Sequence, residues 1–371
     1  MKITGVRSVF SGECHYLLIE TDEGIIGLGE ATLHTRQLAV DGVFRHLESV
    51  LIGQDPFRTE HIWQDIFRCT FWRGGPVLMA ALSAVDMALW DIKGKALNTP
   101  VYNLLGGKCR DKLRVYIGIG GKSPEELAEK GIEMKEKGYT ALRFCPTDNP
   151  EKDGVMDVIS GVRKSVKYTQ ALREAVGDDI DLVLECHTRM TPPTAVELCN
   201  EVAPLHPLFV EDPLRADSPE AFRNLRAHTH VALGTGEKFG AKWDYKCLIE
   251  EELIDYVRTD ICNCGGITEM KKIAAYAEAH YMEMVPHGVH HAGFLALMHL
   301  DFSTPNFCLQ EDWMSSSHPD WLDYDVTFKD GYLTMGDRPG IGVTLLEDKV
   351  QPFIMREHPH WRRPDGSVQD W

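Results

Sequence analysis

Apolar residues recur along the chain with two different spacings. In the first hundred residues, short runs with strand character come first, and stretches with an apolar residue every three to four positions follow them. The longest helical stretch ends at Asn98 and Pro100, two residues that favour helix termination. This part of the chain predicts a small α+β unit. Its predicted strands are 3–10, 15–21 and 24–31, and its predicted helices are 36–52, 58–68 and 76–98.

After residue 113, strand-like runs alternate with amphipathic stretches such as 123–138 and 266–281. Eight strands that alternate with helices are typical of a (β/α)8 barrel. A doubly wound open sheet is the structural alternative, but no GxGxxG motif follows a first strand here. The predicted barrel strands are 114–119, 140–145, 181–186, 207–212, 230–237, 254–260, 281–288 and 306–312.

The pattern therefore predicts an α/β protein with a modified (β/α)8 TIM barrel at residues 113–325. An α+β N-terminal capping domain occupies residues 1–112. The C-terminal segment, residues 326–371, has a hairpin pattern around Asp330 and Gly331, and we expect it to pack back on the capping domain.

The composition argues against several functional classes. The chain has 371 residues, and its formal net charge of −17 argues against binding to nucleic acid or to an anionic membrane. No run approaches the length of a membrane span, and the N-terminus lacks the apolar core of a secretory signal. The ten cysteines are scattered, which favours reduced thiols, and Cys262 with Cys264 is only a weak indication of zinc. We expect a cytoplasmic homo-oligomer that acts on a small molecule.

A polar residue stands where each apolar run of the predicted barrel ends. These residues are Arg143, Glu185 with His187, Glu211, Glu237, Asp260, His287 and Glu311. From Glu185 to Glu311 they recur about every 25 residues, which is the length of one strand–helix unit. Because the C-terminal ends of barrel strands converge on one mouth, where catalytic groups lie, we expect these side chains to meet there.

Three of these residues predict a metal site. Glu185, Glu211 and Glu237 would repel one another strongly unless a cation neutralised them. Ligation by oxygen atoms alone suits Mg²⁺ first and Mn²⁺ second. A single strand-end glutamate is as easily a solvated or salt-bridged surface residue, but three glutamates in phase favour the metal.

Two histidines predict acid/base chemistry. Asp260 stands one strand before His287, and an aspartate bonded to one imidazole nitrogen raises the basicity of the other. We expect His187 to lie across the metal from His287, so that the two form an acid/base pair. His290 and His291 either line the mouth or cap the helix that follows them.

Several motifs resemble the enolase superfamily, in its mandelate-racemase-like branch of sugar-acid dehydratases. The motifs are the segment 71–107, "ECH", "VEDP", "GEKF", "IDYVRTDICNCGGIT" and the tail "DGSVQDW". They are most similar to mannonate dehydratase, its starvation-sensing relatives and galactonate dehydratase, over nearly the whole chain. The resemblance implies an α+β cap over a modified barrel, one essential Mg²⁺, and abstraction of the proton next to a substrate carboxylate.

The resemblance also implies roles for individual residues. Glu185, Glu211 and Glu237 match the metal ligands, and His187 matches an acid/base histidine. Arg258 and His287 match substrate-contacting positions, and Glu311 matches a glutamate that hydrogen-bonds the substrate. Further candidates for contact with the substrate are Arg143, His34, His291, Trp72 and Arg73. For Trp72 and Arg73, packing in the core or the cap is an equal alternative.

The chain departs from mannonate dehydratase at several positions. The segment 144–156 is short and lacks the catalytic tyrosine of that family, and Gly118 replaces a histidine. His34 stands in place of an asparagine and His291 in place of an aspartate. Asp260 replaces a threonine, and its pairing with His287 is similar to galactonate dehydratase. We therefore do not expect mannonate as the substrate.

These observations predict Mg-dependent dehydration of an acid sugar (an aldonate) to a 2-keto-3-deoxy acid. His287 would take the C2 proton, His187 would protonate the departing C3 hydroxyl, and Glu311 would donate or share a hydrogen bond with the enediolate. An epimerase or cycloisomerase on the same site remains an alternative. So does a binding or regulatory homologue with weak activity.

Overall fold

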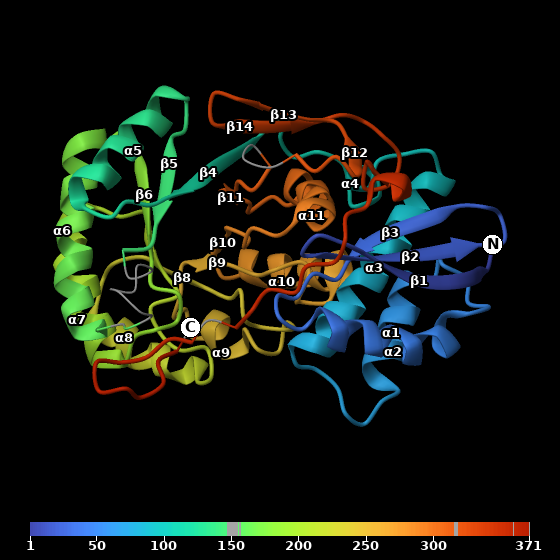
Figure 1. The fold of residues 1–371 in the computed structure, drawn as a ribbon, viewed down its shortest axis with the longest axis horizontal. Helices are drawn as coiled ribbons and strands as arrows, with labels where there is room; N and C mark the ends of the chain where they lie inside the picture. The colour runs from blue at the N-terminus through green and yellow to red at the C-terminus, as the bar shows by residue number, and fades with distance from the viewer. Residues whose placement is uncertain (147–154, 156, 315–317, 359, 371) are drawn as a thin grey trace.

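The protein places a capping unit beside a barrel (Figure 1). The computed structural model describes residues 1–146, 155, 157–314, 318–358 and 360–370. The capping unit contains β1 (Ile3–Ser11), β2 (Cys14–Thr21), β3 (Ile26–Glu30), α1 (Gln37–Leu51), α2 (Thr59–Arg68), α3 (Pro76–Ala96) and α4 (Val101–Leu104).

Eight short parallel strands form the barrel. They are β4 (Leu113–Ile119), β5 (Ala141–Phe144), β6 (Asp181–Glu185), β7 (Phe209–Glu211), β8 (Leu233–Thr235), β9 (Tyr256–Val257), β10 (Glu283–Met284) and β11 (Gln310–Glu311). The helices between and after them are α5 (Pro124–Glu136), α6 (Val158–Val176), α7 (Pro192–Val202), α8 (Phe222–His228), α9 (Lys246–Glu250), α10 (Gly266–Glu278) and α11 (His291–Ser303), with short 3-10 turns at Ala203–Leu205 and Pro219–Ala221.

The barrel is closed by hydrogen bonds between neighbouring strands in chain order. Each strand from β4 to β9 pairs in parallel with the next, and β11 pairs in parallel with β4. Between β10 and β11 the ring is completed by the backbone of Met284, which donates to Asn306 at 2.8 Å and accepts from Cys308 at 2.9 Å. The buried side chains that fill the interior are Tyr116, Ala141, Val183, Phe209, Val285 and Leu309, so the barrel is a packed core with its open mouth at the C-terminal strand ends.

Helix α3 joins the capping unit to the barrel. A Cβ atom on Gly29 of β3 would lie 1.9 Å from the carbonyl oxygen of Ala84, so only glycine lets the backbone of α3 lie directly on the cap sheet. The other face of α3 meets α10 of the barrel, where Asp86 accepts a hydrogen bond of 2.9 Å from the backbone N–H of Thr268. Since α3 is covered on both sides, it is apolar around most of its circumference.

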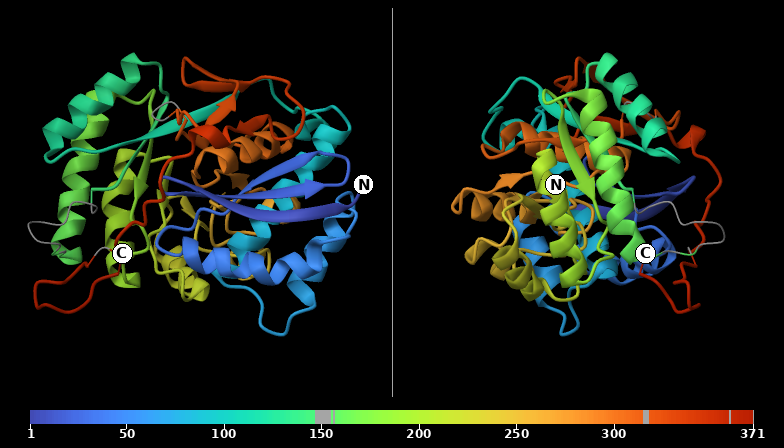
Figure 2. Two further views of the ribbon diagram at one scale, coloured as in Figure 1. Left: turned by 45° about the vertical axis from the view of Figure 1, so that its right-hand side comes forward. Right: turned by 90° about the vertical axis from the view of Figure 1, so that its left-hand side faces the viewer.

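The C-terminal segment contacts both parts of the molecule. It contains β13 (Val326–Lys329), β14 (Tyr332–Met335), β15 (Val343–Leu345) and a 3-10 turn at Glu347–Lys349, and β12 (Leu322–Tyr324) directly precedes it. The β13–β14 hairpin extends the barrel sheet beside β4. The chain then meets the cap, where the backbone N–H of Ile354 donates to Gly12 at 2.8 Å, and it returns to the barrel, where Asp370 forms an ion pair with Arg215. Figure 2 shows this C-terminal segment, drawn in red, where it runs from the capping unit to the barrel.

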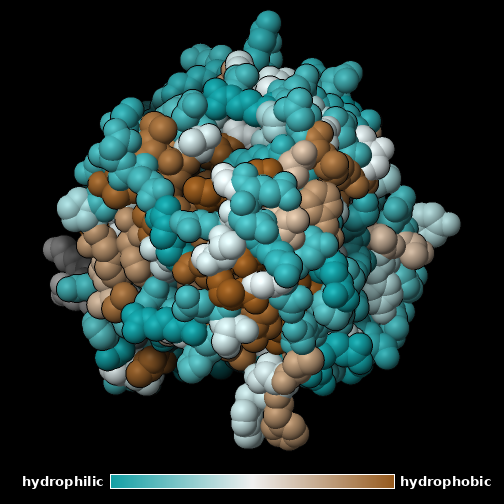
Figure 3. All heavy atoms as spheres, turned by 90° about the vertical axis from the view of Figure 1, so that its right-hand side faces the viewer, coloured by the Kyte–Doolittle hydropathy of each residue, from teal (hydrophilic) through white to brown (hydrophobic). Residues whose placement is uncertain are grey.

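The predicted elements match the observed ones in order and type, but the barrel strands after β4 are shorter than predicted. The segment 281–288, for example, contains only the two-residue strand β10. The rest of that segment leaves the regular ladder toward the mouth, although the N–H of His287 still donates to Thr259 at 3.1 Å. Among the described residues no helix is long and apolar enough to cross a membrane. The face on the capping side carries hydrophobic patches among hydrophilic residues (Figure 3).

Candidate active site

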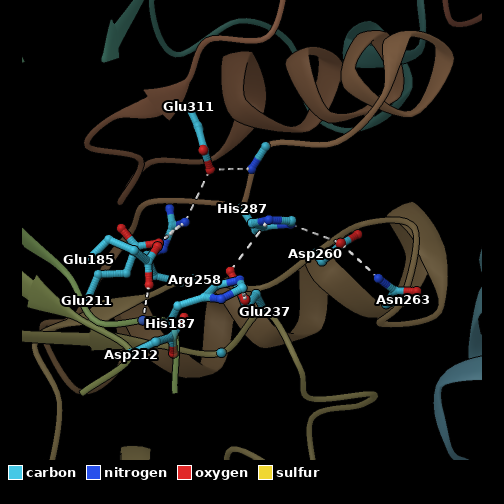
Figure 4. A network of polar contacts seen from close by, with 12 residues as sticks. Glu185, His187, Glu211, Asp212, Glu237, Arg258, Asp260, Asn263, His287 and Glu311 are labelled. Carbon is cyan, nitrogen blue, oxygen red and sulfur yellow. Dashed lines mark hydrogen bonds and ion pairs between the residues drawn. The ribbon is translucent and has the colours of Figure 1, made fainter. Parts of the chain in front are cut away.

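The ends of β6, β7 and β8 bring three carboxylates together. Glu185 and Glu211 are the last residues of β6 and β7 and lie opposite one another in the parallel ladder, and Glu237 follows β8 by two residues. One carboxylate oxygen of each lies within 4.8 Å of those of the other two. The in-phase spacing in the sequence therefore corresponds to a cluster in space (Figure 4).

The electrostatics of this cluster favour a bound cation. Burial raises the pKa of Glu211 well above its ordinary value, and the nearby Glu185 carboxylate adds to the rise. Burial alone would raise the pKa of Glu185 too, but the guanidinium of Arg143, 2.5 Å from its Oε2, lowers it below the usual range. In the described part of the chain, Oε2 of Glu211 and Oε2 of Glu237 are buried without a hydrogen-bond partner. Three oxygen donors with unused lone pairs fit a hard divalent ion such as Mg²⁺.

His287 forms a dyad with Asp260, as predicted. Its Nδ1 lies 3.0 Å from Oδ2 of Asp260, and that carboxylate also accepts hydrogen bonds from the backbone N–H of Cys262 and the side chain of Asn263. Burial would lower the pKa of His287, but Glu237 and Asp260 outweigh it and raise the pKa to about 9. The Nε2 atom faces Glu237 at 3.5 Å, so the basic nitrogen points toward the carboxylate cluster.

His187 lies in a tight turn directly after β6. It and Thr188 both have positive φ angles, 53° and 59°, which is a strained conformation for residues other than glycine. The turn is held by hydrogen bonds from the N–H of His187 to Oε1 of Glu185 at 2.5 Å and from the N–H of Thr188 to the carbonyl of Asp212 at 2.7 Å. This turn directs Nε2 of His187 toward Oε1 of Glu237, 3.9 Å away.

Glu311, at the end of β11, holds the loop that carries His287. Its Oε2 accepts a hydrogen bond of 2.8 Å from the N–H of Gly288. Burial would raise the pKa of Glu311, but Arg143 and Arg258 lower it to about 2. It is therefore an ionised acceptor at neutral pH in this structure, and its donation or sharing of a hydrogen bond with an enediolate stays a prediction.

Arg258 does not face the mouth, and the expected contact between Arg258 and a substrate is wrong in this structure. Its side chain is 0% exposed and lies beneath the cluster, where it pairs with Glu211 and, at 3.2 Å, with Glu311. It also donates to the hydroxyl of Tyr116 and to the carbonyl of Val285 at 3.1 Å. Arg258 thus offsets the negative charge of the site from below.

Arg143, by contrast, borders open space. A recess of about 380 Å³ beside the cluster is lined by Arg143, Glu311, Gly118, Cys145 and Trp313, together with apolar residues of the adjoining strand ends. A Cβ atom on Gly118 would lie 3.7 Å from Arg143, so the glycine that replaces the family's histidine leaves this side of the mouth open. The short segment 144–156 follows here, and its residues 147–154 and 156 lie outside the described residues.

His34 brings the capping unit to the mouth. Its Nε2 lies 2.8 Å from Nε2 of His290, and His290 lies beside Trp313, with ring centroids 5.9 Å apart. His291 is the first residue of α11 and forms, with His290 and Cys14, a second group of possible metal donors.

Trp72 and Arg73 lie elsewhere. Trp72 is 80% exposed on the loop between α2 and α3, and Arg73 lies over the ring of Phe67 at 5.5 Å. Within the described residues no hydrogen bond or ion pair joins either of them to the glutamate cluster. The expected substrate contact of this loop stays a prediction, and the position of Arg73 over Phe67 agrees with the packing alternative.

Sequence reasoning missed several residues of the site. Arg189 donates to Nδ1 of His187 at 2.7 Å, Asn263 donates to Asp260 at 2.8 Å, and Asp212 accepts a hydrogen bond from Thr235. Each stands within three residues of a candidate that was identified. The signal available was a polar side chain in the same strand-end loop as a catalytic candidate.

The chain matches two family models. Residues 4–106 match the "Mandelate racemase / muconate lactonizing enzyme, N-terminal domain", and residues 126–349 match the "Enolase C-terminal domain-like" model. A curated relative, the D-galactonate dehydratase of Pectobacterium atrosepticum, is 38% identical over 387 aligned positions that cover 100% of both chains.

Solved structures share the whole fold. An enolase from Pantoea ananatis with bound D-gluconate and Mg has a TM-score of 0.93 and 31% identity, with 99% of each chain covered. An enolase from Agrobacterium radiobacter bound to Na and L-malate has a TM-score of 0.90 and 29% identity, with 100% of each chain covered.

Proposed function

The chain belongs to the enolase superfamily, in its mandelate racemase/muconate lactonizing enzyme group, and from this premise we propose that it dehydrates an acid sugar to a 2-keto-3-deoxy acid. The family resemblance read from the sequence motifs is thereby confirmed. The observation that carries the proposal is the approach of two imidazoles, His187 and His287, to the carboxylate of Glu237. His287 is paired with Asp260 and suits a base, and His187 can protonate the leaving C3 hydroxyl.

The names of two similar proteins narrow the range of substrates that we propose: one is a D-galactonate dehydratase, and the other was crystallised with D-gluconate. D-galactonate and D-gluconate differ only at C4, so the two carbons that react, C2 and C3, have the same configuration in both. We propose an aldonate with this C2 and C3 configuration as the substrate. D-mannonate is the C2 epimer of D-gluconate and would present its C2 hydrogen on the face away from His287.

The three glutamates would hold the metal. Mg²⁺ bound by Glu185, Glu211 and Glu237 supplies Lewis-acid stabilisation of the negative charge that develops on the substrate carboxylate. Arg143 lies at the boundary between this cluster and the recess, where its positive charge can attract the same carboxylate.

The protein residues divide the two proton movements between them. In its neutral form His287 takes the C2 proton at Nε2, because Asp260 accepts the hydrogen bond from Nδ1 and the lone pair is then on Nε2. His187 serves the C3 hydroxyl, which departs as water. Glu311 fixes the backbone of Gly288 and thereby the position of the base.

The test is a library of acid sugars incubated with the protein and Mg²⁺, with keto-acid formation as the readout. We expect product from D-galactonate or D-gluconate and none from D-mannonate. If no member of the library yields keto acid while ligand binding is measurable, a binding or regulatory role replaces this proposal. If the reaction in deuterated water returns labelled acid sugar without keto acid, the protein is an epimerase.

We also propose a cytoplasmic homo-oligomer. Exposed apolar side chains such as Leu38, at 57% exposure, lie on the capping unit, and they support contact between copies. Sedimentation velocity tests the homo-oligomer, and a single species of monomer mass would exclude it. Cell fractionation tests the cytoplasmic location.

A further inference from the structure

We propose that Cys14, His290 and His291 form a second metal site, which binds Zn²⁺ and joins the capping unit to the barrel. Among the described residues, this is the one group of possible metal donors that contains sulfur and nitrogen, because the other group is the glutamate cluster. The inference goes beyond the proposed dehydration and does not depend on it, since it concerns a different ion at different residues.

The three donors come from both parts of the molecule. Cys14 is the first residue of β2 in the capping unit, whereas His290 and His291 stand at the start of α11. One donor atom of each lies within 4.8 Å of those of the other two. The two parts are held together here, because Glu30 at the end of β3 accepts a hydrogen bond of 2.8 Å from the N–H of Gly293 in α11. The docking of the cap on α11 therefore creates the cluster.

The position of His290 does not explain its side chain. His290 is the N-cap residue of α11, but within the described residues its side chain makes no capping hydrogen bond. Its Nε2 instead lies 2.8 Å from Nε2 of His34, with the two rings nearly perpendicular at 77°. Histidines that bind metals usually have such a partner, which fixes the orientation of the ring. His34 is 27% exposed, so an ion can reach the cluster from solvent beside it.

The chemistry of the donors selects the ion. One thiolate with two imidazoles suits Zn²⁺, whose bonds to sulfur and nitrogen are about 2.3 Å and about 2.0 Å long. Donor atoms around a tetrahedral Zn²⁺ are thus roughly 3.3–3.8 Å apart, and side-chain shifts on the order of 1 Å bring this cluster to that geometry. A water molecule completes the four ligands. Mg²⁺ prefers oxygen donors, so the two clusters of the protein select different ions.

The protonation states of the donors are compatible with this ion. Burial lowers the pKa of His290 to about 3, so the ring is neutral, which is the form that binds a metal. Burial, together with the nearby Glu30, raises the pKa of Cys14 to about 12, so its thiol is protonated before an ion arrives. Zn²⁺ displaces that proton, which passes to solvent as the Zn–S bond forms. The ion then neutralises a thiolate that would otherwise lie beside a buried carboxyl group.

The test uses Co²⁺ as a probe of the zinc site. Co²⁺ gives a thiolate-to-metal absorption band in the near ultraviolet only when sulfur is a ligand, and excess Mg²⁺ keeps the glutamate cluster occupied. We expect the wild type to show this band and Zn²⁺ to abolish it by displacing Co²⁺. Cys14→Ser should show no band. His290→Gln should weaken Co²⁺ binding by a factor on the order of 10² or more, since loss of a partner outside the ligand shell already costs about 10- to 100-fold.

Cys199→Ser is the matched control. Cys199 on α7 is buried like Cys14, and burial raises its pKa to about 12 as well, but it is not one of the clustered donors. This variant should keep the band and the affinity of the wild type. Zn²⁺ should also raise the urea midpoint of the wild type and of Cys199→Ser but not that of Cys14→Ser. If circular dichroism shows that Cys14→Ser is unfolded, the half-buried position in His290→Gln decides the matter.

Three outcomes overturn the inference. The first is a folded wild type that shows no thiolate band with Co²⁺. The second is a band that persists in Cys14→Ser, which would assign the sulfur to another cysteine. The third is Zn²⁺ binding that is lost in Glu211→Gln and kept in His290→Gln, which would place the ion at the glutamate cluster. A wild type that makes no keto acid defeats the proposed function instead and leaves these readouts unchanged.

Discussion

His187 and His287 approach the two different oxygens of one carboxylate. Nε2 of His187 lies 3.9 Å from Oε1 of Glu237, and Nε2 of His287 lies 3.5 Å from Oε2. The two imidazoles come from loops 100 residues apart in the sequence. A substrate held beside Glu237 would therefore meet a proton acceptor and a proton donor at neighbouring atoms, which is the geometry that elimination requires.

Replacement of His287 tests whether this residue is the base that takes the C2 proton. We expect His287→Asn to lower kcat by a factor on the order of 10³, because asparagine can bond Asp260 but cannot take the C2 proton. The measurement is keto-acid formation together with exchange of the C2 hydrogen in deuterated water, and both should fall together. A variant that keeps wild-type exchange would assign the base to another residue.

Metal dependence can be tested on activity and on stability. Chelation should abolish turnover, and added Mg²⁺ should restore it in the wild type but not in Glu211→Gln, since that change removes one of the three clustered oxygen donors. Mg²⁺ at about 100 times its Kd should raise the free energy of unfolding by about 2.7 kcal/mol in the wild type but not in Glu211→Gln. Glu133→Gln, an exposed glutamate paired with Lys130 and Lys137, is the matched control and should respond to Mg²⁺ as the wild type does.

Much of the fold could be predicted because each element carries its own periodicity. The helix predicted at 76–98 is α3, and the strand predicted at 3–10 is β1. Strand length was less predictable, since a barrel strand ends where its neighbours leave the ladder. Apolar residues after Met284 remain buried although they leave the strand, as Val285 does, so apolar character alone does not mark the end.

The glutamates of the site could be predicted from spacing, but the arginines could not be sorted in the same way. Arg143 and Arg258 both stand near strand ends, yet one borders the recess and the other is fully buried. The difference comes from Tyr116 and Glu311, which cover Arg258 and are remote from it in the sequence. The same limit applies to His34, whose partner His290 is 256 residues away.

Arg258 should be essential for folding more than for binding. Removal of its charge in Arg258→Met takes one buried cationic partner away from Glu211 and Glu311, and we expect the free energy of unfolding to fall by about 3–5 kcal/mol. Urea unfolding of the metal-free protein measures this loss. Arg223→Met removes an arginine from an exposed pair with Glu251 and should change stability little. Equal stability of Arg258→Met and the wild type would contradict the burial of this charge network.

His299 makes the protein sensitive to acid. It is fully buried on α11, where Nδ1 accepts a hydrogen bond of 3.2 Å from the N–H of Tyr102, and burial lowers its pKa to about 3. The unfolded chain binds a proton at this residue below its ordinary pKa of about 6.5, whereas the folded chain does not. The stabilisation that depends on the neutral imidazole is therefore complete above pH 6.5 and is lost as the pH falls from 6.5 toward 3. Between pH 7 and pH 5 we expect a loss of about 2 kcal/mol from this residue.

Urea unfolding at both pH values should show a smaller decrease in His299→Gln than in the wild type, because glutamine does not titrate. Buried carboxyl groups such as Glu30, whose pKa burial raises to about 7, contribute a slope of opposite sign that is common to both proteins, so only the difference between the two slopes reports on His299. Identical slopes would show that the imidazole is protonated as readily in the folded protein as in the unfolded chain.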